Sequence, residues 1–191
     1  MHTIHHTKAV ILRSQPTREA DKMYWLFTED FGLVVAVATG VRKAGSKLAG
    51  QLVDYSFVES DLVKGRDVWR LISATSICAP LAGQTQHPLA RAYVRILGAV
   101  DRFVIDEGVH GDIFATLREA GDMVGGAYTD AKRFDTLVIW RILVSLGYIG
   151  VDLLDQQLYA TPLLGALASL DDAQTTAMIE RVNMTIKETH L

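Results

Sequence analysis

The feature that most constrains the fold is a pair of short apolar segments, Lys22 to Thr28 and Leu33 to Thr39, joined by a tight acidic turn. Both segments are rich in strand-forming residues, which predicts an antiparallel pair of β-strands. In the first segment, side chains of apolar character alternate onto both faces: Met23, Trp25 and Phe27 on one, Tyr24 and Leu26 on the other. Because such a strand needs cover on both sides, we expect a closed or covered sheet.

Three further segments are typical of strands: Lys8 to Arg13, Leu52 to Lys64 and Val68 to Ala74. Five strands within about 75 residues, with one longer connection between the third and the fourth, predict a small five-stranded barrel of the oligonucleotide-binding (OB) class. An SH3-like barrel and a plain meander are the alternatives that the same pattern allows.

The apolar spacing becomes helical after Pro80. Helices are predicted from Leu89 towards Gly108, from Ile113 to Val124, from Thr129 or Asp130 to Gly147, after Pro162, and from Asp171 onwards, where Gln174 completes a capping box. The sequence therefore predicts an α+β protein of two domains: an OB-fold barrel over residues 1–80 and an all-helical domain over residues 81–191.

Positive charge is concentrated in the connection that follows the third strand. Arg42, Lys43 and Lys47 lie there among glycines, an arrangement that suits a phosphate backbone, although a solvated hairpin tip is the alternative. OB barrels hold single strands by combining aromatic platforms with cations. The candidate nucleic-acid-binding residues are Arg13, Lys22, Arg42, Lys43, Lys47 and Arg70.

The net charge of the chain is -3, but it is unevenly distributed. Residues 1–80 contain ten Lys or Arg against eight Asp or Glu, giving +2, and the remainder contains nine against fourteen, giving -5. A polyanionic partner should therefore meet the N-terminal half, with modest and salt-sensitive affinity. Because phosphates carry no sequence information, we expect little sequence preference.

Four arginines are candidates for binding a protein partner in the helical half. Arg91, Arg95 and Arg102 fall on one side of the first predicted helix, where a solvated face that pairs with nearby carboxylates is the alternative. Arg141 interrupts an otherwise apolar run, and a buried arginine needs a partner.

No catalytic motif is present. His2, His5 and His6 have no carboxylate or cysteine spaced to complete a metal site, although an enzyme built around them is an alternative hypothesis. A single cysteine, Cys78, excludes an internal disulfide. No apolar run is long enough to span a membrane and no signal peptide is evident. We therefore expect a cytoplasmic protein without catalytic residues, metal or cofactor.

Several segments carry a resemblance to a known family. In the N-terminal half these are Glu19-Ala20-Asp21-Lys22, Leu26-Phe27-Thr28, Gly32-Leu33 and Ala38-Thr39-Gly40-Val41-Arg42-Lys43; in the helical half they are Phe134, Leu137, Arg141, Leu146-Gly147-Tyr148 and Asp152-Leu153. Together they resemble the RecO family of bacterial recombination mediators. The chain is short for the family. Many members carry a four-cysteine zinc site after the Leu-Gly-Tyr segment, whereas Asp155-Gln156-Gln157-Leu158 has no cysteine, so the chain resembles the zinc-free members.

The resemblance implies a non-enzymatic function in DNA repair and recombination. A RecO-like protein would bind single-stranded DNA, anneal complementary strands and, with RecR, help RecA displace single-strand-binding protein. By position, Arg42, Lys43 and Lys47 would contact phosphate. The helical domain would receive the acidic, Phe-ended tail of single-strand-binding protein in a pocket with basic and apolar walls. The alternative is a protein-only adaptor, whose barrel and helices bind partners and not nucleic acid.

Overall fold

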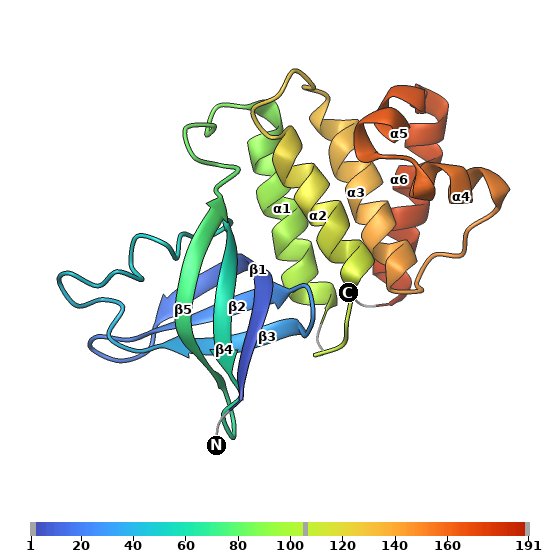
Figure 1. The fold of residues 1–191 in the computed structure, drawn as a ribbon. Helices are drawn as coiled ribbons and strands as arrows, with labels where there is room; N and C mark the ends of the chain where they lie inside the picture. The colour runs from blue at the N-terminus through green and yellow to red at the C-terminus, as the bar shows by residue number, and fades with distance from the viewer. Residues whose placement is uncertain (1–2, 105–106, 190–191) are drawn as a thin grey trace. The chain divides into compact units, whose positions relative to one another are not determined.

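The computed structural model describes residues 3–104 and 107–189. The described chain forms five strands followed by six helices (Figure 1). They are β1 (Ile4–Pro16), β2 (Lys22–Thr28), β3 (Gly32–Ala38), β4 (Phe57–Val63), β5 (Trp69–Cys78), α1 (Pro88–Phe103), α2 (Gly111–Met123), α3 (Ala131–Ser145), α4 (Leu153–Ala160), α5 (Leu163–Ser169) and α6 (Asp172–Glu188). Within the described ranges, no helix has the length and apolar character that crossing a membrane requires.

The five strands close into a barrel with the order β1-β2-β3-β5-β4, and β4 pairs with β1 to complete it. All neighbours are antiparallel except β3 and β5, which run parallel through Ala36 opposite Trp69 and Val37 opposite Arg70. This is the arrangement expected of an OB barrel. The prediction of a closed sheet is confirmed, and closure explains why both faces of β2 are apolar.

Side chains that point into the barrel form its core. The inward face of β2 contributes Tyr24 and Leu26, which are 1% and 0% exposed. Leu62 and Trp69 reach the same cluster from β4 and β5. The alternating apolar pattern of the sequence thus specifies which face of each strand is buried.

The fourth strand is shorter than the sequence predicted: β4 begins at Phe57 and not at Leu52. Tyr55 has a φ of 69°, in the left-handed region, and the Ser56 N–H donates a hydrogen bond of 3.2 Å to the Val53 carbonyl. The chain therefore turns where the predicted strand would have been extended. Leu52 is nevertheless buried, because the turn packs it against the barrel core.

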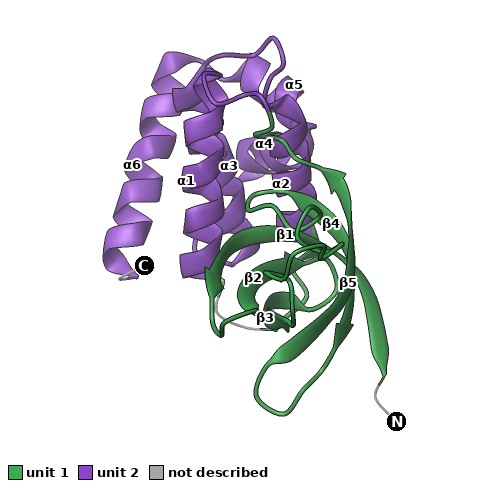
Figure 2. Ribbon diagram, turned by 90° about the vertical axis from the view of Figure 1, so that its left-hand side faces the viewer, with its two compact units in different colours: residues 1–82, 104–111 green, residues 83–103, 112–191 purple. Residues whose placement is uncertain are grey.

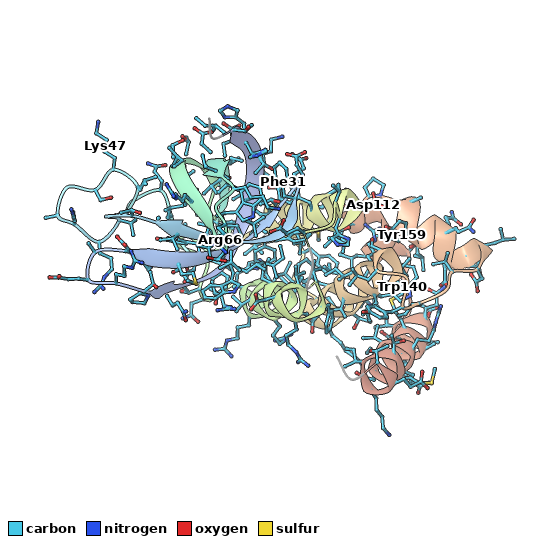
Figure 3. All side chains as sticks on the ribbon, turned by 90° about the horizontal axis from the view of Figure 1, so that it is seen from below. Phe31, Lys47, Arg66, Asp112, Trp140 and Tyr159 are labelled. Carbon is cyan, nitrogen blue, oxygen red and sulfur yellow. The ribbon has the colours of Figure 1, made fainter. Side chains whose placement is uncertain are left out.

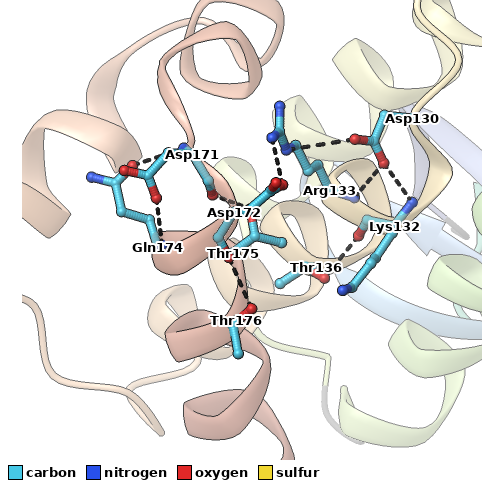
Figure 4. A network of polar contacts seen from close by, with 9 residues as sticks. All are labelled: Asp130, Lys132, Arg133, Thr136, Asp171, Asp172, Gln174, Thr175 and Thr176. Atoms are coloured by element: carbon cyan, nitrogen blue, oxygen red, sulfur yellow. Dashed lines mark hydrogen bonds and ion pairs between the residues drawn. The ribbon is translucent and has the colours of Figure 1, made fainter.

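Helix α3 forms the centre of the helical unit and packs against α1, α5 and α6. Its N-terminus is capped by Asp130, whose carboxylate accepts hydrogen bonds from the Lys132 and Arg133 N–H groups. Arg133 also bridges Asp130 and Asp172, the first residue of α6 (Figure 4). The predicted capping box of α6 is confirmed: Asp171 and Gln174 hydrogen-bond each other's backbone N–H groups.

Helix α4 was not predicted. Asp152 caps it and Asp155 completes a capping box, and Asp155 is also buried against the guanidinium group of Arg181 at 2.9 Å. A carboxylate paired in this way anchors a helix of only eight residues.

The chain divides into two compact units (Figure 2). The barrel unit comprises Met1–Ala82 together with Val104–Gly111, and the helical unit comprises Gly83–Phe103 and Asp112–Leu191. Whereas the sequence suggested a single boundary near residue 80, this division assigns a second segment, from beyond α1, to the barrel. Within that segment, Glu107 accepts hydrogen bonds from the Trp69 indole N–H at 3.0 Å and the Lys64 ammonium at 2.5 Å.

Candidate nucleic-acid interface

A groove on the outside of the barrel lies between the loop that connects β1 to β2 and the turn that connects β4 to β5. Its volume is about 590 Å³. Arginines, aspartates, apolar side chains and hydroxyl groups line it: Thr17, Arg18, Asp21, Met23, Val37, Thr39, Gly65, Arg66, Asp67, Val68 and Arg70. We call it the barrel groove. OB barrels bind oligonucleotides on the face of strands 2 and 3, between these same two connections.

The register of the strands builds the floor of the barrel groove. Met23 on β2 lies opposite Val37 on β3, and Val37 lies opposite Arg70 on β5. Met23 and Val37 are partly exposed and Arg70 is exposed. The floor thus places an apolar surface, suited to the face of a base, beside a guanidinium group suited to phosphate.

The β4–β5 turn forms one wall and depends on Gly65. A Cβ atom at this position would lie 2.2 Å from the Val68 carbonyl oxygen, so only glycine fits. The close approach fixes the turn and presents Arg66 and Asp67, both exposed, at the rim. The position of Arg66 is marked in Figure 3.

The β1–β2 loop forms the opposite wall and is tied to the chain that follows β3. Asp21, which is 7% exposed, accepts a hydrogen bond of 2.8 Å from the Gly40 N–H. The Arg42 N–H donates to the Ala20 carbonyl at 2.9 Å, and the Arg42 guanidinium donates to the Arg18 carbonyl at 3.3 Å. Arg42 therefore joins the predicted basic loop to the wall that carries Arg18.

The other two cations of the predicted loop extend away from the groove. Lys43 and Lys47 are exposed and neither lines it. Lys47 lies far along the loop and its side chain points away from the barrel strands (Figure 3). The loop thus provides a second set of cations, and Arg42 connects this loop to the wall of the groove.

Arg13 and Lys22 lie over aromatic rings. The Arg13 guanidinium carbon is 3.4 Å from the centre of the Trp25 ring, and these residues are paired across β1 and β2. The Lys22 ammonium is 5.4 Å from the centre of the Tyr24 ring. Trp25 is partly exposed and follows Met23 on the same face of β2, so this cation–π pair extends the floor of the groove.

Of the six predicted nucleic-acid-binding residues, the structure brings only Arg70 into the barrel groove itself. Arg18 and Arg66 line it and were missed. Both lie in short connections that the sequence alone does not bring together. The Gly-Arg-Asp turn between two predicted strands was the signal that could have identified Arg66, because OB barrels use this connection in binding.

A second groove lies in the helical unit between α1, α3 and α6, with a volume of about 600 Å³. Apolar side chains form much of it: Ala99, Phe103, Ile139, Ile179, Val182 and Ile186. Arg95, Arg102 and Lys132 add positive charge. All three cations are exposed, and Arg95 pairs with Asp135 at 3.0 Å. We call it the helical groove, and it combines apolar surface with cations.

The remaining two predicted arginines lie elsewhere. Arg91 is exposed on α1 but does not line the helical groove. Arg141 is 4% exposed; it donates hydrogen bonds to the Leu158 and Thr161 carbonyls and lies 3.8 Å from Glu119. Burial lowers the pKa of the Arg141 guanidinium, and the Glu119 charge opposes that effect. Arg141 therefore links α3 to the chain around α4 and α5.

The histidines that the structure describes have local partners. His5 packs edge-on against Phe31 and Trp69, and His6 hydrogen-bonds Asp61 at 2.5 Å. In the described part of the chain, no three or more His, Cys, Asp or Glu side chains gather as metal ligands would. His2 and His190 lie outside the described residues.

A closed five-stranded barrel with a cationic groove, followed by a helical unit, defines a protein of the OB-barrel class. Residues 1–79 match the family model described as Recombination protein O N terminal. The chain is 27% identical to the DNA repair protein RecO of Chlorobium limicola over 165 residues, which cover 85% of this chain and 62% of that relative. It is 39% identical to RecO of Clostridium novyi over 69 residues, 36% of this chain and 27% of the relative. The barrel is therefore similar to the N-terminal domain of Recombination protein O, and the chain spans less than two thirds of these relatives' length.

Proposed function

We propose that the chain is a recombination mediator in DNA repair. It binds single-stranded DNA, anneals complementary strands and helps to load a recombinase onto strands covered by single-strand-binding protein. The observation that best supports DNA binding is the barrel groove, in which Arg18, Arg66 and Arg70 surround an apolar floor. The match of this barrel to Recombination protein O supports the role in repair.

Annealing requires neutralised phosphates and base edges that stay free to pair. The guanidinium groups of the barrel groove supply charge, and Met23, Val37 and Trp25 supply apolar and aromatic surface to the faces of bases. Such contacts hold a strand without occupying its pairing edges. Lys43 and Lys47 offer cations for a second stretch of backbone.

The test is fluorescence anisotropy of a labelled single-stranded oligonucleotide across a salt series. An Arg66→Gln, Arg70→Gln variant should bind more weakly and lower the slope of log K against log salt by about two, roughly one for each lost phosphate contact. A Lys43→Gln, Lys47→Gln variant, measured in parallel, reports on the loop alone.

Lys187→Gln is the matched control, because it removes one exposed cation from α6 outside both grooves. Its slope should equal that of the unaltered protein. If the groove variant folds normally and keeps the full slope, the barrel groove is not the DNA-binding surface.

The helical groove supports the partner side of the proposal. We infer that it receives the acidic, Phe-ended tail of single-strand-binding protein. The apolar walls suit an aromatic residue, and Arg102 and Lys132 suit carboxylates. RecR and RecA remain partners proposed from the family likeness alone.

A synthetic peptide that is acidic and ends in Phe tests this site by calorimetry. Arg102→Glu should weaken its binding about tenfold or more, because contacts between charged groups are worth on the order of 1.5–3 kcal/mol. Arg91→Glu is the control on the same helix, outside the groove. Equal effects of the two changes would indicate attraction by general charge rather than a defined site.

The protein-only adaptor is the second candidate, because the helical groove gives it a site as well. The two experiments separate the candidates. An adaptor would bind the peptide but no oligonucleotide, even at low salt.

A further inference from the structure

The barrel groove contains one carboxylate whose presence is unexpected at a phosphate-binding site. Asp67 is exposed in the β4–β5 turn, and the groove it lines also carries Arg18, Arg66 and Arg70. A carboxylate in this position repels phosphates and so lowers the affinity that the arginines provide. Its chemistry is better suited to a different part of a nucleotide.

The second carboxylate of the groove has a structural function that Asp67 lacks. Asp21 is buried and accepts a hydrogen bond from the Gly40 N–H. Asp67, in contrast, makes no hydrogen bond and no ion pair with any residue that the structure describes. Its oxygens are therefore available to a ligand, even though guanidinium groups line the same groove.

The backbone fixes the place of Asp67. Gly65 approaches the Val68 carbonyl so closely that no other residue fits, which holds the turn in one shape. Asp67 therefore stands on a defined wall, beside a floor made by Met23 and Val37. A base that lies with its face on this floor turns its edge towards a wall of the groove.

A carboxylate accepts hydrogen bonds and donates none at neutral pH, so it distinguishes base edges by their donors. The exocyclic amino group of cytosine has two hydrogens, and Asp and Glu side chains accept a hydrogen bond from the one that does not take part in base pairing. Thymine carries a carbonyl oxygen at the same ring position, which a carboxylate repels. Because cytosine and thymine have rings of the same size, a difference between their affinities reports mainly on the hydrogen bond and not on stacking.

We propose that Asp67 is a specificity-determining residue of the barrel groove, which accepts a hydrogen bond from the exocyclic amino group of a bound base and so favours cytosine over thymine. The inference rests on the proposed binding of single-stranded DNA and adds a base preference to it. Phosphate contacts still provide most of the affinity, and Asp67 adds a smaller term that depends on the base.

The experiment compares labelled dC12 and dT12 in the anisotropy assay. The unaltered protein should bind dC12 more tightly, by about tenfold, since one good base contact is worth on the order of 1–3 kcal/mol. In Asp67→Ala, the ratio of the two affinities should fall to about one, because dC12 alone loses the amino contact while both strands gain equally from the loss of a charge that repels phosphates. Because the amino contact releases no counterion, the ratio should hold across the salt series.

A third strand isolates the contact. In a dC12 analogue built from 2-pyrimidinone, which is cytosine without its amino group, the unaltered protein should lose its preference, and Asp67→Ala should bind it no differently from dC12. Glu19→Ala is the matched control: it removes an exposed carboxylate from the same barrel, outside the groove, and should leave the dC12 to dT12 ratio unchanged.

Equal affinities of the unaltered protein for dC12 and dT12 would overturn the inference, as would a preference that survives in Asp67→Ala. Either result would leave the proposed binding of single strands intact. Failure to bind all three strands at low salt would overturn both, and so would be distinguished from a failure of base preference alone.

Discussion

Asp21 has a larger influence on the barrel groove than its single charge suggests. It is buried, and its carboxylate accepts a hydrogen bond from the Gly40 N–H. One side chain therefore holds the β1–β2 loop next to the chain that follows β3. That bond joins the wall that carries Arg18 to the basic loop that carries Arg42, and both arginines are candidate DNA contacts.

Asp21→Ala should therefore lower the free energy of unfolding by about 1–3 kcal/mol, because it leaves a partly buried N–H group without an acceptor. Urea denaturation measures this. Asp67→Ala, which removes an exposed carboxylate from the same groove, is the control and should change stability by less than about 0.5 kcal/mol. Equal urea midpoints for Asp21→Ala and the unaltered protein would contradict the assignment.

At the residue scale, the sequence predicted that arginines would line a binding surface, but it did not predict which arginines the fold brings together. Arg70 was recognised because it lies within a strand next to Trp69. Arg18 and Arg66 come together only through barrel closure, which no local pattern encodes. Arg141 was predicted to need a partner, and it has Glu119 and two carbonyl groups, but these come from segments that are distant in the sequence.

At the scale of elements, Glu107 connects the segment after α1 to strand β5 and the β4–β5 connection. Hydrogen bonds from Lys64 and then from Trp69 hold the pKa of Glu107 below its usual range. A carboxyl group whose pKa is lowered in the folded state contributes stability above its unfolded pKa of about 4.3 and loses that contribution as the pH falls through the folded pKa.

The Trp69 indole N–H signal in NMR spectra should therefore stay constant as the pH falls from 7 and should shift only below the usual glutamate pKa of about 4.3, where Glu107 takes up a proton. Glu107→Gln should remove this transition while leaving the other indole signals unchanged. A transition that persists in Glu107→Gln would assign it to another carboxyl group.

Elements with strong local signals were predicted, and those without them were not. The position of β2 and the capping box of α6 were correct because alternation and an Asp-x-x-Gln pattern are local. Helix α4 was missed because its capping box ends in Asp155 rather than Glu or Gln. The start of β4 was wrong because the left-handed φ of Tyr55 is unusual for a residue other than glycine.

At the scale of the whole molecule, the boundary between the helical unit and the barrel unit lies between Val100 and Val104, which are four residues apart in the sequence. Val100 is 0% exposed and belongs to the helical unit, whereas Val104 is 1% exposed and belongs to the barrel unit. The sequence predicted one helix, from Leu89 towards Gly108, that contained both valines. It could not assign them to different units, because their apolar character is the same.

Val104→Ala should accelerate amide hydrogen exchange in the barrel strands, and Val100→Ala should accelerate it in α1 and α3, each corresponding to about 1–3 kcal/mol of lost stability. The two variants serve as controls for each other, since the chemical change is identical. Faster exchange in α1 and α3 for both variants would place Val104 with the helices.

The return of Val104–Gly111 to the barrel also sets an order of events during synthesis. A ribosome makes all five strands before the helices, but Glu107, which accepts hydrogen bonds from Trp69 and Lys64, follows only after the whole of α1 has been added. At about 5–20 residues per second, the intervening Gly83–Phe103 takes on the order of 1–4 s to translate. For that interval the newly made barrel lacks Glu107, and its completion is timed by the translation of a helix that belongs to the other unit.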